Sequence, residues 1–596
     1  MIAMPVATSQ RVVKWGKPLD MFGVRLIISI FLCALQFPGL FVDLDRTEPN
    51  GDAHLFFHHE DMARRTILSY GEMPAWDPYS CGGIPGIANP QNPALSPDMV
   101  FRLAFGTDAG RRLAVFLFFL CGLEGMFRLG RHYGLSPLPS LFSAMVFAMC
   151  GRFTAATAVG WLHMLTFFLI PGVLFCFERG LRSWSFRILG GALLAWMILG
   201  AGTYPFPYAL VVIGLTAVVR TVEALSNRTE QRTFRWYSPA ATLCSMIGIA
   251  LLLSAVRTLP LSMVVFGLPR HVPLSPSQYN AQQLIAFLLD GTRSHYSCEY
   301  YFLGPIALLL AFLSCHKTAQ GARIMALVFF VLALGNFARF APFSLLSSLP
   351  LFNQLRAAER QLIVVIMYLA LAGGFGLAGI AARPRVRFLP TSIGFLLALA
   401  VAAVAVTQLN DANRIRAGKV YIDPAPLSDT ENGFRQARGN FRAPQYFGAL
   451  NLGNLACNEA TPFPKSAALR ADLPAEEYPL DPTVARVNRL RWTPNSIALR
   501  VRANKPTRIL VNQNYNRYWT ANIGGIRNHH GLLAVDVPQG KWRLKLVYRD
   551  PWQRVGALIS SIALLSALAF YVTLALRKWR ALRQCWRGWT WSPETR

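Results

Sequence analysis

The sequence predicts a polytopic α-helical membrane protein with a separate β-rich domain outside the membrane. Apolar residues occupy 53% of its 596 positions and charged residues only 15%, with a mean hydropathy of +0.34. A soluble protein has roughly 25% charged residues. The apolar residues here gather into about twelve runs, each near the roughly 17–25 residues that a helix needs to cross a bilayer.

The apolar runs follow one another along most of the chain. Their centres lie near Ile30, Phe118, Met145, Phe168, Ala195, Val212, Ile249, Leu309, Val331, Tyr368, Leu397 and Leu565. The first run follows a basic tail and has no small-residue cleavage site, so we expect a retained signal anchor. We divide the chain into a multi-spanning membrane domain (1–409, with a large first loop at about 43–110), a β-rich domain (410–551), and a last helix with a basic tail (552–596).

Lysine and arginine in the short loops predict the orientation. If the N-terminus is cytosolic, twelve crossings place seven segments inside, and each of these carries two or more basic residues. The intervening turns near Gly160 and Tyr204 carry almost none. We therefore expect both termini in the cytosol, with the loop over residues 43–98 and the β-rich domain on the outer side.

The alternation of apolar and polar residues in the block at about 410–551 indicates a β domain. Segments such as SIALRVRA, TRILVNQNY and KWRLKLVYRD alternate apolar and polar residues between Gly, Pro and Asn, which favours a β-sandwich of about 140 residues. It could be a lid or sugar-binding module above a membrane site, or a structural cap. Tyr515, Tyr518 and Trp519 could stack on a sugar ring, although aromatic residues in short strands more often belong to a core.

The remaining patterns exclude several classes of function. No P-loop, no GxGxxG after a strand, no HExxH and no CxxC occurs, so nucleotide-driven and zinc-protease chemistry have no support. The net charge of +29 is spread over cytosolic turns and the outer domain, so it does not indicate nucleic acid. Cys81, Cys298 and Cys457 are expected outside, where one pair could form a disulfide.

The loop over residues 43–98 holds nine of the 30 acidic residues of this basic chain. Asn50 and Gly51 indicate a turn that would hold Asp52 just beyond the first helix, where its carboxylate could act as a general base. Residues 54–68 could form an amphipathic helix on the membrane interface. Trp76, Asp77 and Tyr79 follow, with the aromatic rings expected at headgroup level. Alternatively, these carboxylates only solvate a loop.

A second group of charges precedes the run that opens at Gln361. Arg356 and Arg360 are four residues apart, so on a helix they would share one face. Two guanidinium groups there could hold a phosphate at the outer surface. Alternatively, they extend towards lipid phosphate, with Glu359 as an internal partner.

These segments carry a family resemblance that spans almost the whole chain. Asn50-Gly51-Asp52, GEMPAWDP with GGIP, LPLF leading to Arg356 and Arg360, and YWTANIGG with VPQGK resemble the YfhO-like bacterial membrane proteins, within the GT-C glycosyltransferases. The chain departs from that pattern in having His54 and Phe56-Phe57 where many relatives have Gln. It also has Gly-Gly in the outer domain where relatives often have Asp-Gly.

The resemblance implies a GT-C-like fold in the bacterial plasma (inner) membrane and a sugar donor carried on polyprenyl phosphate. Asp52 would deprotonate an acceptor hydroxyl on a glycan, lipid or polymer, and Arg356 and Arg360 would bind the donor phosphate. Glu60, Asp61, His54, Trp76, Asp77 and Tyr79 would support the loop or the acceptor. A divalent metal held by Asp52 with Glu60, Asp61 or a nearby histidine stays open. No nucleic acid partner is implied.

Two other classes compete with this interpretation. A transporter or flippase of lipid-linked glycans would need ionisable residues deep in the membrane or internal repeats. Few such residues occur, with Glu124, Arg128, Arg152 and Arg257 near span ends, and no clear repeat is visible. A non-catalytic assembly protein would leave Asp52 dispensable.

Overall fold

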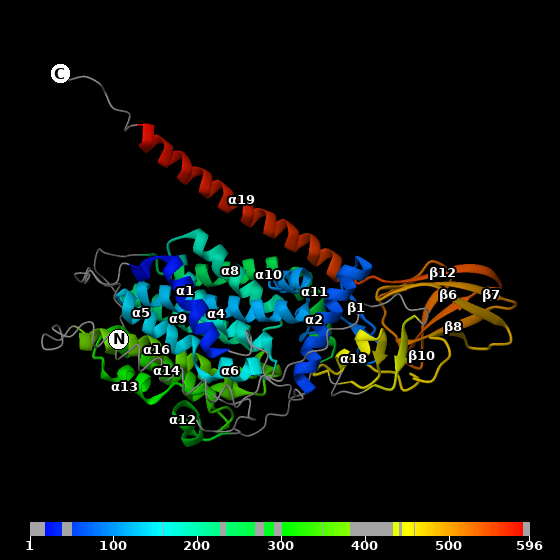
Figure 1. Ribbon diagram of the computed structural model, residues 1–596, viewed down its shortest axis with the longest axis horizontal. Helices are drawn as coiled ribbons and strands as arrows, with labels where there is room; N and C mark the ends of the chain where they lie inside the picture. Colours follow the sequence, from blue (N-terminus) through cyan, green and yellow to red (C-terminus); the bar gives the residue numbers. More distant parts are fainter. Residues whose placement is uncertain are drawn as a thin grey trace.

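The computed structural model describes residues 18–37, 51–158, 160–226, 234–268, 279–290, 301–349, 351–381, 433–439, 444–457 and 459–587. Most helices form one bundle, and the larger sheets lie beyond one end of it (Figure 1). Helix α2 lies between the bundle and the strands (Figure 1).

The helical elements alternate long helices with short, broken ones. They are α1 (Phe22–Gln36), α2 (Gly51–Tyr70), α3 (Met99–Phe105), α4 (Thr107–His132), α5 (Pro137–Ala148), α6 (Gly151–Ala158), η3 (Leu162–Leu169), α7 (Ile170–Gly180), α8 (Trp184–Leu199), α9 (Pro205–Ser226), α10 (Ser238–Leu253), α11 (Ala255–Gly267), α12 (Ala281–Leu289), α13 (Pro305–Leu313), α14 (Lys317–Ala333), α15 (Pro342–Leu346), η4 (Phe352–Gln354), η5 (Ala358–Gln361), α16 (Leu362–Ala381), α18 (Pro444–Ala449) and α19 (Pro551–Arg587).

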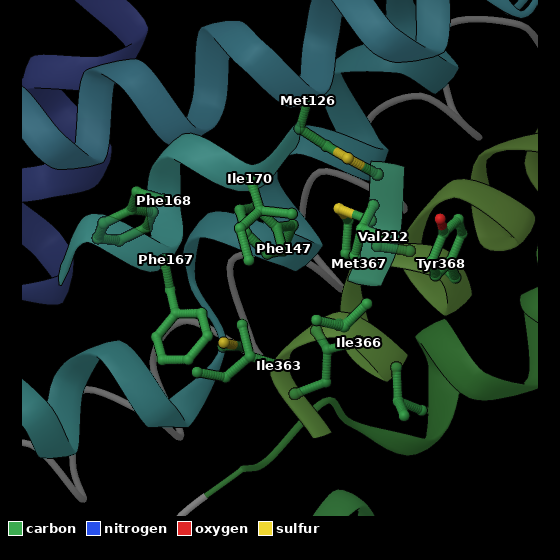
Figure 2. Packing of buried hydrophobic residues seen from close by; sticks show 14 of the residues in the cluster. Met126, Phe147, Phe167, Phe168, Ile170, Val212, Ile363, Ile366, Met367 and Tyr368 are labelled. Atoms are coloured by element: carbon green, nitrogen blue, oxygen red, sulfur yellow. The ribbon is translucent and has the colours of Figure 1, made fainter. Parts of the chain in front are cut away.

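Helix α16 lies at the centre of the bundle because its sequence is apolar on every face. All its residues from Leu362 to Leu377 are buried. It packs against α5, α13 and α14, and its side chains meet those of α4, η3 and α9 in one hydrophobic cluster. Figure 2 shows part of this core, including Phe147, Phe168 and Ile366. A helix that is hydrophobic all round is expected only inside a large core or a membrane.

Five helical segments of the described chain are long and apolar enough to cross a membrane, or seven if each of two bent pairs is one span. These segments indicate a membrane protein, but the expected twelve crossings are not confirmed. Helix α1 has 15 residues, α8 has 16 and α13 only nine, which is too short for a straight crossing. The run near Leu397 lies outside the described residues.

The strands of the two larger sheets lie mostly where the alternating pattern predicts them, in the last quarter of the chain, and two short strands lie in the loop after α2. They are β1 (Trp76–Asp77), β2 (Ile84–Pro85), β3 (Arg435–Ala437), β4 (Leu452–Asn454), β5 (Glu477–Pro479), β6 (Ala485–Thr493), β7 (Ser496–Ala503), β8 (Thr507–Asn514), β9 (Trp519–Ala521), β10 (Gly525–His529), β11 (Leu532–Val537) and β12 (Gly540–Tyr548).

Two four-stranded sheets, in the orders β10-β11-β8-β5 and β6-β7-β12-β9, contain only antiparallel pairs. Inward residues of both sheets form a common hydrophobic cluster, which includes Leu499, Val511 and Leu546. Trp519 is 2% exposed in this cluster, so its role is packing rather than sugar stacking.

Helix α19 runs from the strands along the outside of the bundle (Figure 1). Small residues make the contact: a Cβ at Gly556 would lie 2.2 Å from the Ala255 carbonyl oxygen, and the Ser560 hydroxyl accepts a hydrogen bond from the Val256 amide at 3.0 Å. Close helix approach through small residues is typical of association in a bilayer.

Candidate active site around Trp161

Helix α2 places Asp52 in its first turn, where the helix dipole favours a negative charge. Residues 53–63 of this helix are all buried, so α2 does not lie on the membrane interface as the sequence suggested. It is buried because bundle residues cover it on one side and the strands on the other. Asp52 itself is half-buried.

A backbone turn at Gly160 brings Trp161 close to Asp52. Gly160 has φ +74°, and a Cβ on it would lie 2.7 Å from the Cβ of Ala53, so a larger residue would push the two segments apart. Arg111 donates a hydrogen bond to the Gly160 carbonyl at 3.2 Å. The Trp161 indole then donates from Nε1 to Oδ2 of Asp52 at 3.1 Å.

Two arginines lie against the same indole. The guanidinium carbon of Arg360 is 5.3 Å from the Trp161 ring centre and 4.0 Å from that of Tyr204. The guanidinium carbon of Arg152 is 5.6 Å from the Trp161 ring and 5.3 Å from the Tyr301 ring. Such stacking favours the cation. One carboxylate and two cations therefore surround Trp161.

Arg152 is only 1% exposed, and neither its Nε nor its Nη2 has a hydrogen-bond partner within the described parts of the chain. Burying a charge without an acceptor is costly. A bound anion would satisfy these donors. The arrangement therefore suits a phosphate or another anionic group beside the Asp52 carboxylate.

Arg356 does not share a helical face with Arg360. It lies between η4 and η5, is exposed, and has no hydrogen bond or ion pair among the described residues. The segment that leads to Arg360 is fixed instead by Tyr208, whose hydroxyl donates to the Ala357 carbonyl at 3.0 Å. The structure thus brings Asp52 and Arg360 to one ring and leaves Arg356 on the surface.

Glu60 links α2 to α3 by an ion pair, and Asp61 forms one within α2. Arg102 Nε is 2.6 Å from Glu60 Oε2, and Arg65 Nε is 2.6 Å from Asp61 Oδ2. The Thr107 hydroxyl also donates to Asp61 at 2.6 Å. His54 is buried on the same helix. Among the described residues, no group of three or more His, Cys, Asp or Glu is placed to hold a metal ion.

Trp76, Asp77 and Tyr79 tie the loop to the strands rather than to headgroups. The Trp76 indole donates to Gln513 at 2.8 Å and packs against Trp519 and Tyr548. The Tyr79 hydroxyl donates to Asn451 at 3.0 Å. Asp77 accepts from the Tyr79 amide and the Ser80 hydroxyl, and burial raises the pKa of its carboxyl.

A disulfide joins Cys81 to Cys457 across the same junction, so these two pair among the three cysteines that the sequence predicts outside. Close by, His59 and Glu459 form a fully buried ion pair with 3.3 Å between Nε2 and Oε1. Burial alone would lower the pKa of His59, but the Glu459 carboxylate outweighs it and the pKa is raised. Burial and the charge of His59 lower the pKa of neighbouring His58 to about 3.

Sequence reasoning missed Trp161 as a site residue and treated Arg152 only as an ionisable residue near a span end. The turn at Gly160, with an arginine eight residues before it inside an apolar run, is the signal that could have found them. The close approach of Gly160 to Ala53 could not be predicted from a sequence pattern.

No protein-family model matches the chain, and no curated protein matches it. Among solved structures, the chain is similar to an Archaeoglobus fulgidus oligosaccharyltransferase tethered to an acceptor peptide, with 10% identity, a TM-score of 0.38, and coverage of 75% of this chain and 64% of that chain. It is also similar to the oligosaccharyltransferase AglB of that organism in complex with an inhibitory peptide and a dolichol-phosphate, with 12% identity, a TM-score of 0.38, and coverage of 76% and 65%. The chain thus matches just under two thirds of their length, and similarity this low assigns neither fold nor activity.

Proposed function

We propose that this protein is a GT-C-type membrane glycosyltransferase that moves a sugar from a polyprenyl-phosphate donor to a glycan, lipid or polymer acceptor outside the cytosol. One observation carries the proposal: the Asp52 carboxylate and the Arg360 and Arg152 guanidinium groups all contact Trp161. The motifs that resemble those of YfhO-like proteins and the membrane-length helices also support it.

The proposed reaction is a single displacement. Asp52 accepts the proton of an acceptor hydroxyl, and that oxygen attacks the anomeric carbon of the sugar. The bond from this carbon to the phosphate oxygen breaks, and its electron pair stays on the departing polyprenyl phosphate. Arg360 and Arg152 stabilise the growing phosphate charge, and Arg356 approaches it from the surface. The product has inverted anomeric configuration.

The disulfide supports an outer location for the site. Disulfides persist outside the cytosol and are rare within it. Cys81 lies in the loop that follows α2, so a bond between Cys81 and Cys457 favours placing this loop and the strands outside. The strands, as a β-sandwich, would then cover the outer end of the bundle. No nucleotide is needed there, because the donor linkage itself supplies the energy.

The test is transfer from a polyprenyl-phosphate sugar by the purified protein in proteoliposomes. Asp52→Asn is expected to lower kcat by about 10²–10⁴-fold if Asp52 is the base, which is the usual contribution of general-base catalysis. Asp108→Asn is the matched control, since Asp108 is partly exposed and pairs with Arg112 one turn along α4. Wild-type rates in Asp52→Asn would contradict the assignment.

A transporter of lipid-linked glycans is the competing class. The two bundle carboxylates that could serve it are already paired with arginines. Oxygen atoms of Glu124 lie 2.7 Å from Arg25, and those of Glu178 lie 2.8 Å from Arg220, so both carboxylates are already neutralised. Movement of a fluorescent lipid-linked glycan across proteoliposomes, without any transfer product, would favour the transporter and overturn the enzyme.

A further inference from the structure

The sheet β6-β7-β12-β9 has one face turned away from the hydrophobic cluster between the two sheets. This solvent-exposed face carries positive charge without any compensating acid. In strands β6, β7 and β12, exposed side chains on that face include seven basic residues: Arg486, Arg491, Arg500, Arg502, Lys541, Arg543 and Lys545. These three strands contain no Asp or Glu. We call these seven residues the basic face.

The register places the cations directly beside one another. Arg502 pairs with both Arg486 and Lys541 on its two sides, and Arg500 pairs with Arg543. Side chains opposite each other on antiparallel strands have Cβ atoms only about 4.5–5.5 Å apart, and like charges there destabilise the sheet. Such an arrangement is unfavourable unless an anion covers it.

In the second sheet, by contrast, the arginines lie beside a carboxylate. On β8, β10 and β11, Arg508 lies 2.7 Å from Asp536, and Arg527 lies 3.0 Å from the same carboxylate. None of the seven residues of the basic face has an ion pair with any residue in the described part of the chain. The arginines of one sheet share a carboxylate partner, and the seven residues of the basic face have no such partner among the described residues.

A membrane surface fits the basic face poorly. Strand β12 ends at Tyr548, and α19 begins at Pro551, so the strand runs towards the helix that enters the bilayer. Lys541 is seven residues before Tyr548, which places it about 23 Å further along an extended strand. The attraction of anionic lipid falls off within about 8 Å at physiological salt. A bilayer would reach only the row near Lys545.

We propose that the basic face binds an anionic polysaccharide, a chain whose carboxylate or phosphate groups lie along the three strands. A linear polyanion can contact every row at once, whereas a single small anion can contact one. The choice of a polysaccharide rests on the proposed function and on the outer location that the disulfide favours. Binding by the basic face is independent of whether transfer occurs.

The test is binding of polygalacturonate to the full-length protein in nanodiscs of zwitterionic lipid, with neutral dextran as the uncharged probe. Wild type is expected to bind polygalacturonate and not dextran, and to lose affinity as NaCl rises from about 50 to about 200 mM. The double variant Arg500→Gln/Arg543→Gln is expected to bind about tenfold more weakly, since each exposed ion pair contributes up to about 1 kcal/mol.

The matched control is Arg508→Gln/Arg527→Gln, which removes the same charge from the other sheet and is expected to change affinity less than about twofold. Equal losses in the two doubles would show that only net charge matters and would overturn the proposal. So would absence of wild-type binding. Binding of phosphatidylglycerol vesicles, or of single-stranded DNA, that depends on Arg500 and Arg543 while polygalacturonate binding does not, would also overturn it.

Both doubles alter exposed side chains, so their unfolding temperatures are expected to stay within about 2 °C of wild type, as is usual for surface substitutions. The readout contains no donor. A protein that binds polygalacturonate but transfers no sugar would therefore contradict the proposed function alone.

Discussion

The indole nitrogen of Trp161 donates a hydrogen bond to Oδ2 of Asp52 over 3.1 Å, although the two residues are 109 positions apart. The face of the same indole ring contacts two cations, the guanidinium groups of Arg360 and Arg152. Trp161 therefore fixes the distance between the proposed base and the proposed phosphate site. This gives Trp161 a positioning role that can be separated from its role in packing.

Trp161→Phe keeps a ring for the arginines and removes the donor to Asp52. We expect kcat to fall about 10- to 100-fold, since a hydrogen bond to a charged group contributes about 1.5–3 kcal/mol, while the donor KM changes little. Steady-state transfer assays measure both constants. Trp184→Phe, at an exposed position, is the control and should leave both unchanged. A rise in donor KM with unchanged kcat in Trp161→Phe would assign Trp161 to donor binding instead.

Arg152→Gln should lower donor affinity without lowering stability. The Nε and Nη2 groups of Arg152 have no acceptor among the described residues, so removing the charge removes a desolvation cost. We expect an unchanged or higher Tm and a donor KM raised about tenfold or more. Thermal unfolding and transfer kinetics on the same preparations check the two effects.

Arg220→Gln is the contrasting variant. Arg220 lies 2.8 Å from the buried Glu178, so its loss leaves an unpaired carboxylate and should cost about 3–5 kcal/mol. If Arg152→Gln proves as destabilising as Arg220→Gln, Arg152 is a structural residue and not a ligand-binding one.

The Cys81–Cys457 bond should be present in the protein as isolated from cells. Mass spectrometry of peptides prepared without reductant is expected to find this pair. Cys81→Ser/Cys457→Ser should lower the free energy of unfolding by about 2–5 kcal/mol. Free thiols at both positions in the wild type would contradict an outer location, because they would indicate a reducing compartment.

His58 and His59 should give stability opposite dependences on pH. The pKa of His59 is raised, so its stabilising contribution is complete below about 6.5 and is lost as pH rises through the folded-state pKa. His58 has a pKa lowered to about 3, so the folded state loses stability relative to the unfolded state as pH falls below about 6.5.

Thermal unfolding of single variants across pH 5–9 separates the two histidines. His59→Gln should reduce the loss of Tm on the alkaline side, and His58→Gln should reduce the loss on the acid side. The pKa of Glu459 is lowered, so its contribution is complete above about 4.5 and the alkaline effect belongs to His59. Identical pH profiles for wild type and His59→Gln would exclude the ion pair as a stabilising contact.

Much of the fold follows from pattern alone. The apolar runs predict α4, α9, α16 and α19, since about 20 apolar residues have few alternatives to a membrane-length helix. Alternation predicts β7, β8 and β12, because period two exposes one face and buries the other. The predicted twelve crossings are not confirmed, because within the described part of the chain several apolar runs form helices of only 9–16 residues.

The site was predictable only in part. Asp52 follows a turn signal at the start of α2, and Arg360 precedes a long apolar run, so each could be chosen from sequence. Glu60 could not be separated from Asp52, because its partner Arg102 is 42 residues away in the chain, whereas Arg65 lies one helical turn after Asp61 and could have indicated that pair. Trp76 illustrates the same limit: its contacts with Gln513 and Trp519 lie more than 400 residues away in the chain.

The sequence by itself determined that this chain is rich in membrane-length helices, that a β domain precedes the last of them, and that acidic residues gather after the first. These are properties of local periodicity and composition. The tertiary structure decided that Asp52 and Arg360 contact the same indole, that of Trp161. It also decided which cysteines pair, and that the basic face has no carboxylate partner. Those outcomes depend on close approach between distant segments, such as Gly160 on Ala53, and local sequence does not encode such distances.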